Sequence, residues 1–254
     1  MLTSSALGVS VAGRMLVRDL TFNLAPGDVI ALLGPNGVGK TLTLHTLGGL
    51  RPPCQGSIRL GSDDLGGLGR RQIAQRLGLL LQDDAETFPA TALGTALMGR
   101  HPHLGNTAAE SPDDLQRARA ALSAMNLRGF EDRLVSTLSG GERRRLAMAR
   151  LLTQDPGVLL LDEPVNHLDP RHQIDTLEQL SALAIRGHGV IMTLHDPSLV
   201  MRFASHALLL FSDGTWVFDK TRAALTSTNL ARLFQIPYDE YVNARGNTAL
   251  LPGT

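Results

Sequence analysis

A glycine-rich segment between an apolar run and a helical pattern constrains this chain most strongly. It follows Val29–Leu33, an unbroken apolar run typical of a strand buried on both faces. The segment matches G-x-x-x-x-G-K-[ST] and consists of Gly34, Pro35, Asn36, Gly37, Val38, Gly39, Lys40 and Thr41. Glycines let main-chain N–H groups converge on phosphate oxygens, and a helix N-terminus adds positive potential. We therefore predict a phosphate-binding loop (P-loop) in which Lys40 contacts the β- and γ-phosphates and Thr41 binds Mg²⁺, rather than a chance Gly-rich turn.

Two acids end a second apolar run. Val158–Leu161 is followed directly by Asp162 and Glu163. Taken alone, this pattern fits a buried strand that meets solvent at two acidic residues just as well. A P-loop, however, requires a partner for Mg²⁺ on a neighbouring strand, so we predict that Asp162 holds the Mg²⁺ shell. Glu163 then orients and polarises the attacking water as general base.

Strand-sized apolar runs alternate with helical patterns along much of the chain. Runs at 77–81 and 190–194 extend the series of strands, and two runs around Asp213-Gly214 predict a hairpin. Residues 84–155 differ, because their pattern is helical, with a helix start at Ser111-Pro112. The sequence predicts an α/β core interrupted by a helical insert.

Composition excludes several classes of protein. Cys54 is the only cysteine among 254 residues, so an internal disulfide is impossible. Lys plus Arg equals Asp plus Glu at 24 each, which gives no electrostatic reason to expect nucleic acid as a partner. No secretory signal pattern begins the chain, and no apolar stretch approaches the roughly 20 residues that span a bilayer. A role at a membrane would therefore require a partner protein.

A second candidate anion site lies in the helical insert. It consists of Leu138, Ser139, Gly140, Gly141 and Glu142. The S-x-x-E spacing is that of a capping box that opens a helix, and a Ser hydroxyl beside two glycines at a helix N-terminus can also bind an anion. As an isolated pentapeptide, the segment fits a plain helix cap equally well.

In combination, these motifs resemble the ATP-binding-cassette family, whose LSGGQ signature the pentapeptide matches with Glu142 in place of Gln. The resemblance covers about residues 5–237. It implies an α/β fold: a P-loop NTPase core of mainly parallel sheet, with an N-terminal antiparallel β portion and an inserted α-helical subdomain. We expect one cassette domain over 1–254, divided into an α/β core at 1–83 and 156–237, a helical subdomain at 84–155 and a C-terminal tail at 238–254.

The resemblance also implies a composite site. In the family, the signature loop meets the γ-phosphate of ATP bound to the other subunit, so one P-loop and one signature per chain imply a head-to-tail homodimer around ATP and Mg²⁺. Gln82 resembles the glutamine that senses Mg²⁺ and water, Asn166–Asp169 resembles the D-loop, and His195 resembles the histidine that contacts the γ-phosphate. We expect Glu163, His195 and Gln82 to be catalytic, Asp169 to contact nucleotide, and Thr41, Gln82 and Asp162 to hold the metal.

Further residues resemble the ATPases of importers for iron–siderophore, haem and cobalamin. They are Phe88-Pro89, the run Gly99–His103, and the run Glu163–Asp169 with Gln173. The resemblance implies membrane permease subunits and a periplasmic or extracellular binding protein as partners, with this chain peripheral on the cytoplasmic face of the inner (cell) membrane. The competing hypotheses are a soluble cassette ATPase of DNA repair or translation and a cassette without turnover.

Two positions depart from the family pattern, and several others invite alternative interpretations. Val11 stands where an aromatic residue usually stacks on adenine, and Leu42 replaces a second hydroxyl residue that helps to hold the α-phosphate. We expect a solvated or dimer-facing surface for Arg143–Arg145, and a surface loop rather than a metal site at His101–His103. Phe88 with Pro89 would give the permease an apolar contact, and Met98–Arg100 a mobile one.

Overall fold

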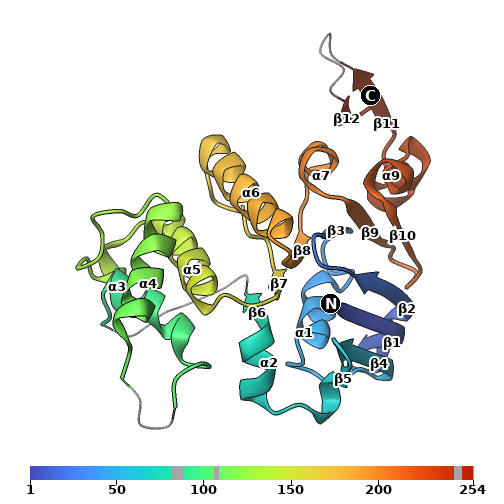
Figure 1. The fold of residues 1–254 in the computed structure, drawn as a ribbon. Coiled ribbons are helices and arrows are strands. Elements are labelled where there is room, and N and C mark those ends of the chain that lie inside the picture. The colour runs from blue at the N-terminus through green and yellow to red at the C-terminus, as the bar shows by residue number, and fades with distance from the viewer. Residues whose placement is uncertain (82–88, 106–108, 243–247, 254) are drawn as a thin grey trace.

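The computed structural model describes residues 1–81, 89–105, 109–242 and 248–253. Its centre is a six-stranded sheet, parallel except for one antiparallel edge strand (Figure 1). In order across the sheet the strands are β10 (Trp216–Lys220), β9 (His206–Leu210), β3 (Val29–Leu33), β8 (Gly189–Thr193), β7 (Val158–Leu161) and β6 (Leu77–Leu80). The antiparallel pair β9–β10 confirms the predicted hairpin, and the α/β fold is the one expected.

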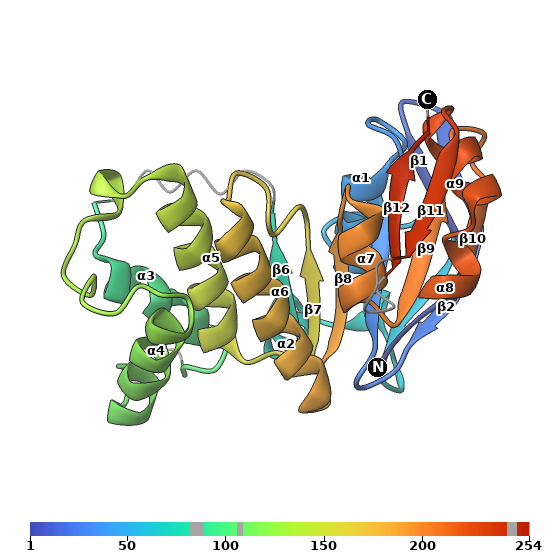
Figure 2. The same ribbon diagram turned by 90° about the horizontal axis from the view of Figure 1, so that it is seen from above.

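A smaller antiparallel sheet covers one face of the centre. Its order is β2 (Arg14–Leu24), β1 (Leu2–Val11), β4 (Gln55–Leu60) and β5 (Asp63–Asp64). This is the N-terminal antiparallel portion that the family resemblance implied, and irregularities interrupt the register between β1 and β2. The antiparallel sheet and the central sheet share one apolar core with the first helix, α1 (Lys40–Leu47), and the three lie side by side in Figure 2.

The central strand β3 explains its unbroken apolar run. Ile30 and Leu32 lie in the core shared with the antiparallel sheet, whereas Ala31 and Leu33 lie in a second core on the opposite face. Successive side chains of a strand point to opposite faces, so a strand covered on both sides needs apolar residues throughout.

Helices build the second core and the insert. They are α3 (Ala92–Leu97), α4 (Pro112–Ala124), α5 (Gly140–Gln154), α6 (Pro170–Ile185), α7 (Pro197–Phe203), α8 (Thr221–Ala224) and α9 (Ser227–Phe234). The remaining helix, α2 (Arg70–Arg76), instead places Ile73 in the core shared with the antiparallel sheet. Helices α3, α4 and α5 gather beyond the edge strand β6, away from the antiparallel sheet (Figures 1 and 2). Their apolar faces join the second core, so the insert packs continuously onto the sheet.

The segment Met98–Arg100 is not the mobile contact that we expected. It forms a 3-10 turn against α5, where a Cβ at Gly99 would lie 2.2 Å from the main-chain oxygen of Arg150. The Arg100 guanidinium lies 2.7 Å from Asp114, and both side chains are largely buried. Hydrogen bonds from the Ser111 main chain and hydroxyl and from Arg100 lower the pKa of Asp114 to about 2. This buried ion pair holds the turn in place.

The end of the chain is more ordered than a simple tail. Strands β11 (Tyr238–Val242) and β12 (Thr248–Pro252) pair as an antiparallel hairpin, and β12 packs against α7. Leu250 provides the buried contact. Across the described parts of the chain, no helix combines the length and apolar character needed to cross a membrane.

Candidate functional site

The P-loop connects β3 to α1 as predicted. Gly37 and Gly39 have φ angles of 78° and 111°, in the region that favours glycine. Gly39 also lies against β2, where a Cβ would be 3.1 Å from the Leu16 side chain. The Lys40 ammonium donates hydrogen bonds to the carbonyl oxygens of Gly34 at 2.7 Å and Pro35 at 3.2 Å. The loop therefore folds back over its own lysine.

The pKa of the Lys40 ammonium is lowered, because burial outweighs the opposing effect of two acids. Burial lowers the pKa of the ammonium, and the carboxylates of Glu163 and Asp162 act in the opposite direction. These acids follow β7, which is separated from β3 only by β8 in the sheet. Since the carboxyl ends of parallel strands meet at one edge of the sheet, the P-loop and the two acids come together although they are far apart in the sequence.

Thr193, the last residue of β8, ties the two acids together. Its hydroxyl donates to Asp162 Oδ1 at 2.9 Å and accepts from the Glu163 N–H at 2.6 Å. Both Thr193 and Asp162 are buried. We did not identify Thr193 from sequence, because a threonine in a strand carries no signal of its own.

The Glu163 carboxylate is held from two sides. His195 Nε2 lies 2.8 Å from Glu163 Oε1, and the Asn166 amide donates to Oε2. Glu163 itself has a φ of 50°, an uncommon conformation for a residue other than glycine. Such conformations persist only where the surroundings hold them, and they occur often at functional sites.

These groups surround one cavity of about 640 Å³. Its lining residues are Asn36, Gly37, Gly39, Lys40, Thr41, Leu42, Glu163, Asn166, His167 and His195. Gly34 and Pro35 instead supply carbonyls to Lys40, and the Val38 side chain is buried against the core. The arrangement brings the P-loop, one of the two acids and the histidine to a single opening.

The site contains donors suited to a divalent cation. Asp162 Oδ2 is buried and has no hydrogen-bond partner within the described ranges of the chain. Thr41, at the start of α1, lines the P-loop cavity. A buried carboxylate oxygen without a partner and a hydroxyl are hard oxygen donors of the kind that Mg²⁺ prefers. The donor set therefore fits Mg²⁺ beside a nucleotide.

The signature segment forms the start of α5. The Ser139 hydroxyl accepts from the Glu142 N–H at 3.3 Å, and the Ser139 N–H donates to the Glu142 carboxylate at 2.7 Å. The latter bond lowers the pKa of Glu142 below its usual range. Among the described residues, none of 138–142 lines the P-loop cavity of its own chain. Gly141 lies behind one wall, since a Cβ there would be 3.7 Å from the carbonyl oxygen of His167.

Asp169, a further expected site residue, lies apart from the cavity. Asp169 caps α6, where its carboxylate accepts from the His172 N–H at 3.0 Å, and the cap lowers the pKa of Asp169. Gln82 lies outside the described residues, as does Phe88.

His103, in the segment weighed as a metal site, contacts the Gln154 carbonyl at 2.9 Å. No cluster of potential metal ligands is present in the parts of the chain that the structure describes.

Arg144 contradicts its expected place on a solvated or dimer-facing surface. Its side chain is half-buried, and its guanidinium donates to the main-chain oxygens of Leu81, Asp162 and Glu163. The charge run at 143–145 hid this role, because side chains that fan out around a helix do not all face solvent.

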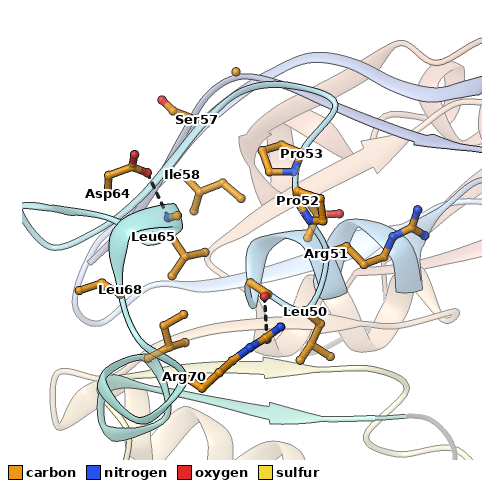
Figure 3. A pocket seen from close by; sticks show the side chains of 15 residues that line it. Leu50, Arg51, Pro52, Pro53, Ser57, Ile58, Asp64, Leu65, Leu68 and Arg70 are labelled. Atoms are coloured by element: carbon orange, nitrogen blue, oxygen red, sulfur yellow. Dashed lines mark hydrogen bonds between the residues drawn. The ribbon is translucent and has the colours of Figure 1, made fainter.

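A second cavity of about 430 Å³ lies between the end of α1, β4 and α2 (Figure 3). The guanidinium groups of its two arginines donate hydrogen bonds to main-chain oxygens. Arg70 donates to the Gly49 oxygen at 2.9 Å, and Arg51 donates to the Ser10 oxygen at 3.0 Å. Both cations therefore stabilise the fold around this cavity.

A P-loop that faces two acids and a histidine across the carboxyl edge of a parallel sheet defines a P-loop nucleotide hydrolase. The protein-family model described as "ABC transporter" matches residues 17–166 of this chain. The chain belongs to the ABC transporter family, and it is an ATP-hydrolysing subunit of that family.

Curated relatives and solved structures agree with this assignment. The hemin import ATP-binding protein HmuV of Gloeobacter violaceus is 38% identical over 84% of this chain and 79% of its own length. HmuV of Rhizobium etli is 35% identical over 94% and 95%. A structure described as an inward-facing metal-chelate type ABC transporter has a TM-score of 0.87 at 31% identity, covering 100% of this chain and 97% of that chain.

Proposed function

We propose that this chain is the ATPase of an importer for a metal chelate and that haem is the favoured cargo among haem, iron–siderophores and cobalamin. The proposal is supported by relatives named for hemin import and by the likeness to a metal-chelate type transporter. The observation that carries the ATPase part is the Glu163 carboxylate, which faces the P-loop cavity while His195 lies 2.8 Å away.

In the proposed mechanism, the phosphates of ATP enter the P-loop and Lys40 exchanges its loop carbonyls for β- and γ-phosphate oxygens. Main-chain N–H groups of the loop and the N-terminus of α1 bind the remaining charge. Glu163 accepts a proton from the attacking water. His195 orients Glu163 and contacts the γ-phosphate. Positioning and electrostatic stabilisation supply most of the rate enhancement in this class of reaction.

Asp162 Oδ2 and the Thr41 hydroxyl are the proposed ligands for Mg²⁺, with Gln82 as a third group whose role rests on the sequence alone. When bound, the ion neutralises charge on the β- and γ-phosphates. Thr193 keeps Asp162 oriented, because its hydroxyl donates to the other carboxylate oxygen.

We further propose that two copies bind head to tail, so that Ser139 to Glu142 of one copy complete the nucleotide site of the other. The position of the signature outside its own P-loop cavity supports this arrangement. Asp169 then lies near the dimer contact, where the D-loops of the two copies meet. Membrane permease subunits would bind the dimer at the cytoplasmic face, and a substrate-binding protein would deliver cargo from the other side.

The import proposal is tested by purification from membranes followed by transport. The tagged chain should co-purify from detergent-solubilised membranes with a polytopic permease. In proteoliposomes, that complex should take up hemin when ATP is enclosed, at a rate well above that for a ferric siderophore or cobalamin. Recovery of the tagged chain without any membrane partner would contradict the proposed importer, and preferential uptake of another chelate would contradict the choice of haem.

Base discrimination should be weak. Val11 ends β1 with 40% of its surface exposed, on the hairpin that places Leu16 against the P-loop. An aromatic–base contact is worth about 1–3 kcal/mol in nucleic-acid complexes, and valine lacks that face. We expect GTP to compete with ATP within about tenfold, and Val11→Tyr to tighten ATP binding by about tenfold.

Competition binding with a fluorescent nucleotide measures both effects. Val11→Ala serves as the control for a change of side chain without an aromatic ring, and we expect it to bind ATP like the wild type. A strong preference for ATP that Val11→Tyr leaves unchanged would mean that another residue holds the base.

A further inference from the structure

Arg144 connects the signature helix to the ends of two central strands. It lies in the second turn of α5, the helix that opens with the signature. One terminal nitrogen of its guanidinium donates to the Leu81 oxygen at 2.5 Å, and the other donates to the oxygens of Asp162 and Glu163, the latter at 2.8 Å. Leu81 follows β6, and the two acids follow the adjacent strand β7.

The three acceptor oxygens lie where the main-chain hydrogen-bond ladder of the sheet ends. The ladder between β6 and β7 ends near the hydrogen bond from the Asp162 N–H to the Leu80 oxygen, at 2.8 Å. Carbonyl groups beyond that point need other donors when they are partly buried. A guanidinium offers donors in a rigid fork, so its two arms reach neighbouring strand ends together, whereas a lysine ammonium acts as a point charge.

Arg144 is one of several contacts that hold Glu163. The Glu163 N–H donates to Thr193, its side chain contacts His195 and Asn166, and its main-chain oxygen accepts from Arg144. The φ of 50° at Glu163 is uncommon, so these contacts offset its conformational cost. Loss of the donor on the oxygen removes one of the contacts that hold this conformation, so the Glu163 carboxylate can shift relative to the P-loop.

We propose that Arg144 is a positioning residue for hydrolysis: it holds Glu163 in register with the P-loop by fastening α5 to the ends of β6 and β7. The proposal rests on the role of Glu163 as general base given above. It predicts that Arg144 affects the chemical step more than the binding of ATP, because Arg144 does not line the nucleotide cavity.

The first test is steady-state ATP hydrolysis by Arg144→Ala and Arg144→Lys. We expect Arg144→Ala to lower kcat by about 10- to 100-fold with KM within about threefold, since small misplacements of a catalytic group have effects of that size. Arg144→Lys should fold normally and still lose at least about threefold in kcat, because it keeps the charge without the fork. Arg119→Ala, an exposed arginine of α4, is the matched control and should hydrolyse ATP like the wild type.

Circular dichroism and thermal unfolding show whether each variant is folded. If Arg144→Ala does not fold, Arg144→Lys carries the test. Wild-type kcat in the folded variants would overturn the proposal. A loss of kcat/KM that comes entirely from a higher KM would also overturn it.

A double-mutant cycle separates this proposal from the role of Glu163. In a Glu163→Gln background there is no carboxylate to position, so Arg144→Ala should lower the remaining rate by less than about twofold. A further loss as large as in the wild-type background would overturn the positioning role and leave the general base unaffected. Full turnover in Glu163→Gln alone would instead disprove the general base.

Discussion

Glu163→Gln will leave ATP binding intact and lower phosphate release by at least about a hundredfold, since a general base contributes about 10²- to 10⁴-fold. The amide keeps the shape of the carboxylate and can still contact His195 and Asn166, which hold Glu163 in the structure. It carries no negative charge, however, and cannot take the proton of the attacking water. ATP that is bound but not hydrolysed should hold two copies together.

Two measurements check this result. Phosphate release gives the rate, and light scattering after gel filtration with ATP and Mg²⁺ gives the size of the particle, which should be that of a dimer. Glu178→Gln is the matched control, because Glu178 is an exposed acid of α6 that pairs with Arg202. Near-normal turnover in Glu163→Gln, with the control also active, would remove Glu163 from the mechanism.

A mixed dimer of two variant subunits will hydrolyse ATP, whereas neither parent homodimer will. One subunit carries Lys40→Ala, and the other carries Ser139→Arg. In a head-to-tail pair, the P-loop of the second subunit faces the signature of the first, so one site is free of both changes and the opposite site contains both. We expect about half of the wild-type ATP bound per mixed dimer and near-background hydrolysis in each homodimer.

Two different affinity tags isolate the mixed dimer before ATP binding and phosphate release are measured. Ser139→Arg also removes the cap of α5, at a cost of about 1 kcal/mol in stability. Ser111→Arg is therefore the control, because Ser111 caps α4 with the same type of capping box and lies outside the signature. Binding at the doubly altered site with none at the intact site would show that the signature does not act in trans.

Local patterns were sufficient for the parts of the site that one segment encodes. The P-loop was predicted because its glycines, its lysine and its flanking strand and helix are contiguous. Both Val29–Leu33 and Val158–Leu161 form strands with the predicted bounds, since strands buried on both faces are apolar without interruption. The capping box at Ser139 likewise depends on residues only three positions apart.

The tertiary structure alone decided how these segments are joined. Thr193 lies 31 positions after Asp162, and Arg144 lies 63 positions after Leu81, so no local period or spacing relates either pair. The burial of Arg100 against Asp114 and the packing of β12 on α7 depend on surfaces formed only when distant elements meet. The sequence by itself therefore determined which groups can bind phosphate and activate water. The strand order β3–β8–β7–β6 and the packing of α5 determined which side chains hold those groups in place, because contacts across a sheet depend on which strands become neighbours.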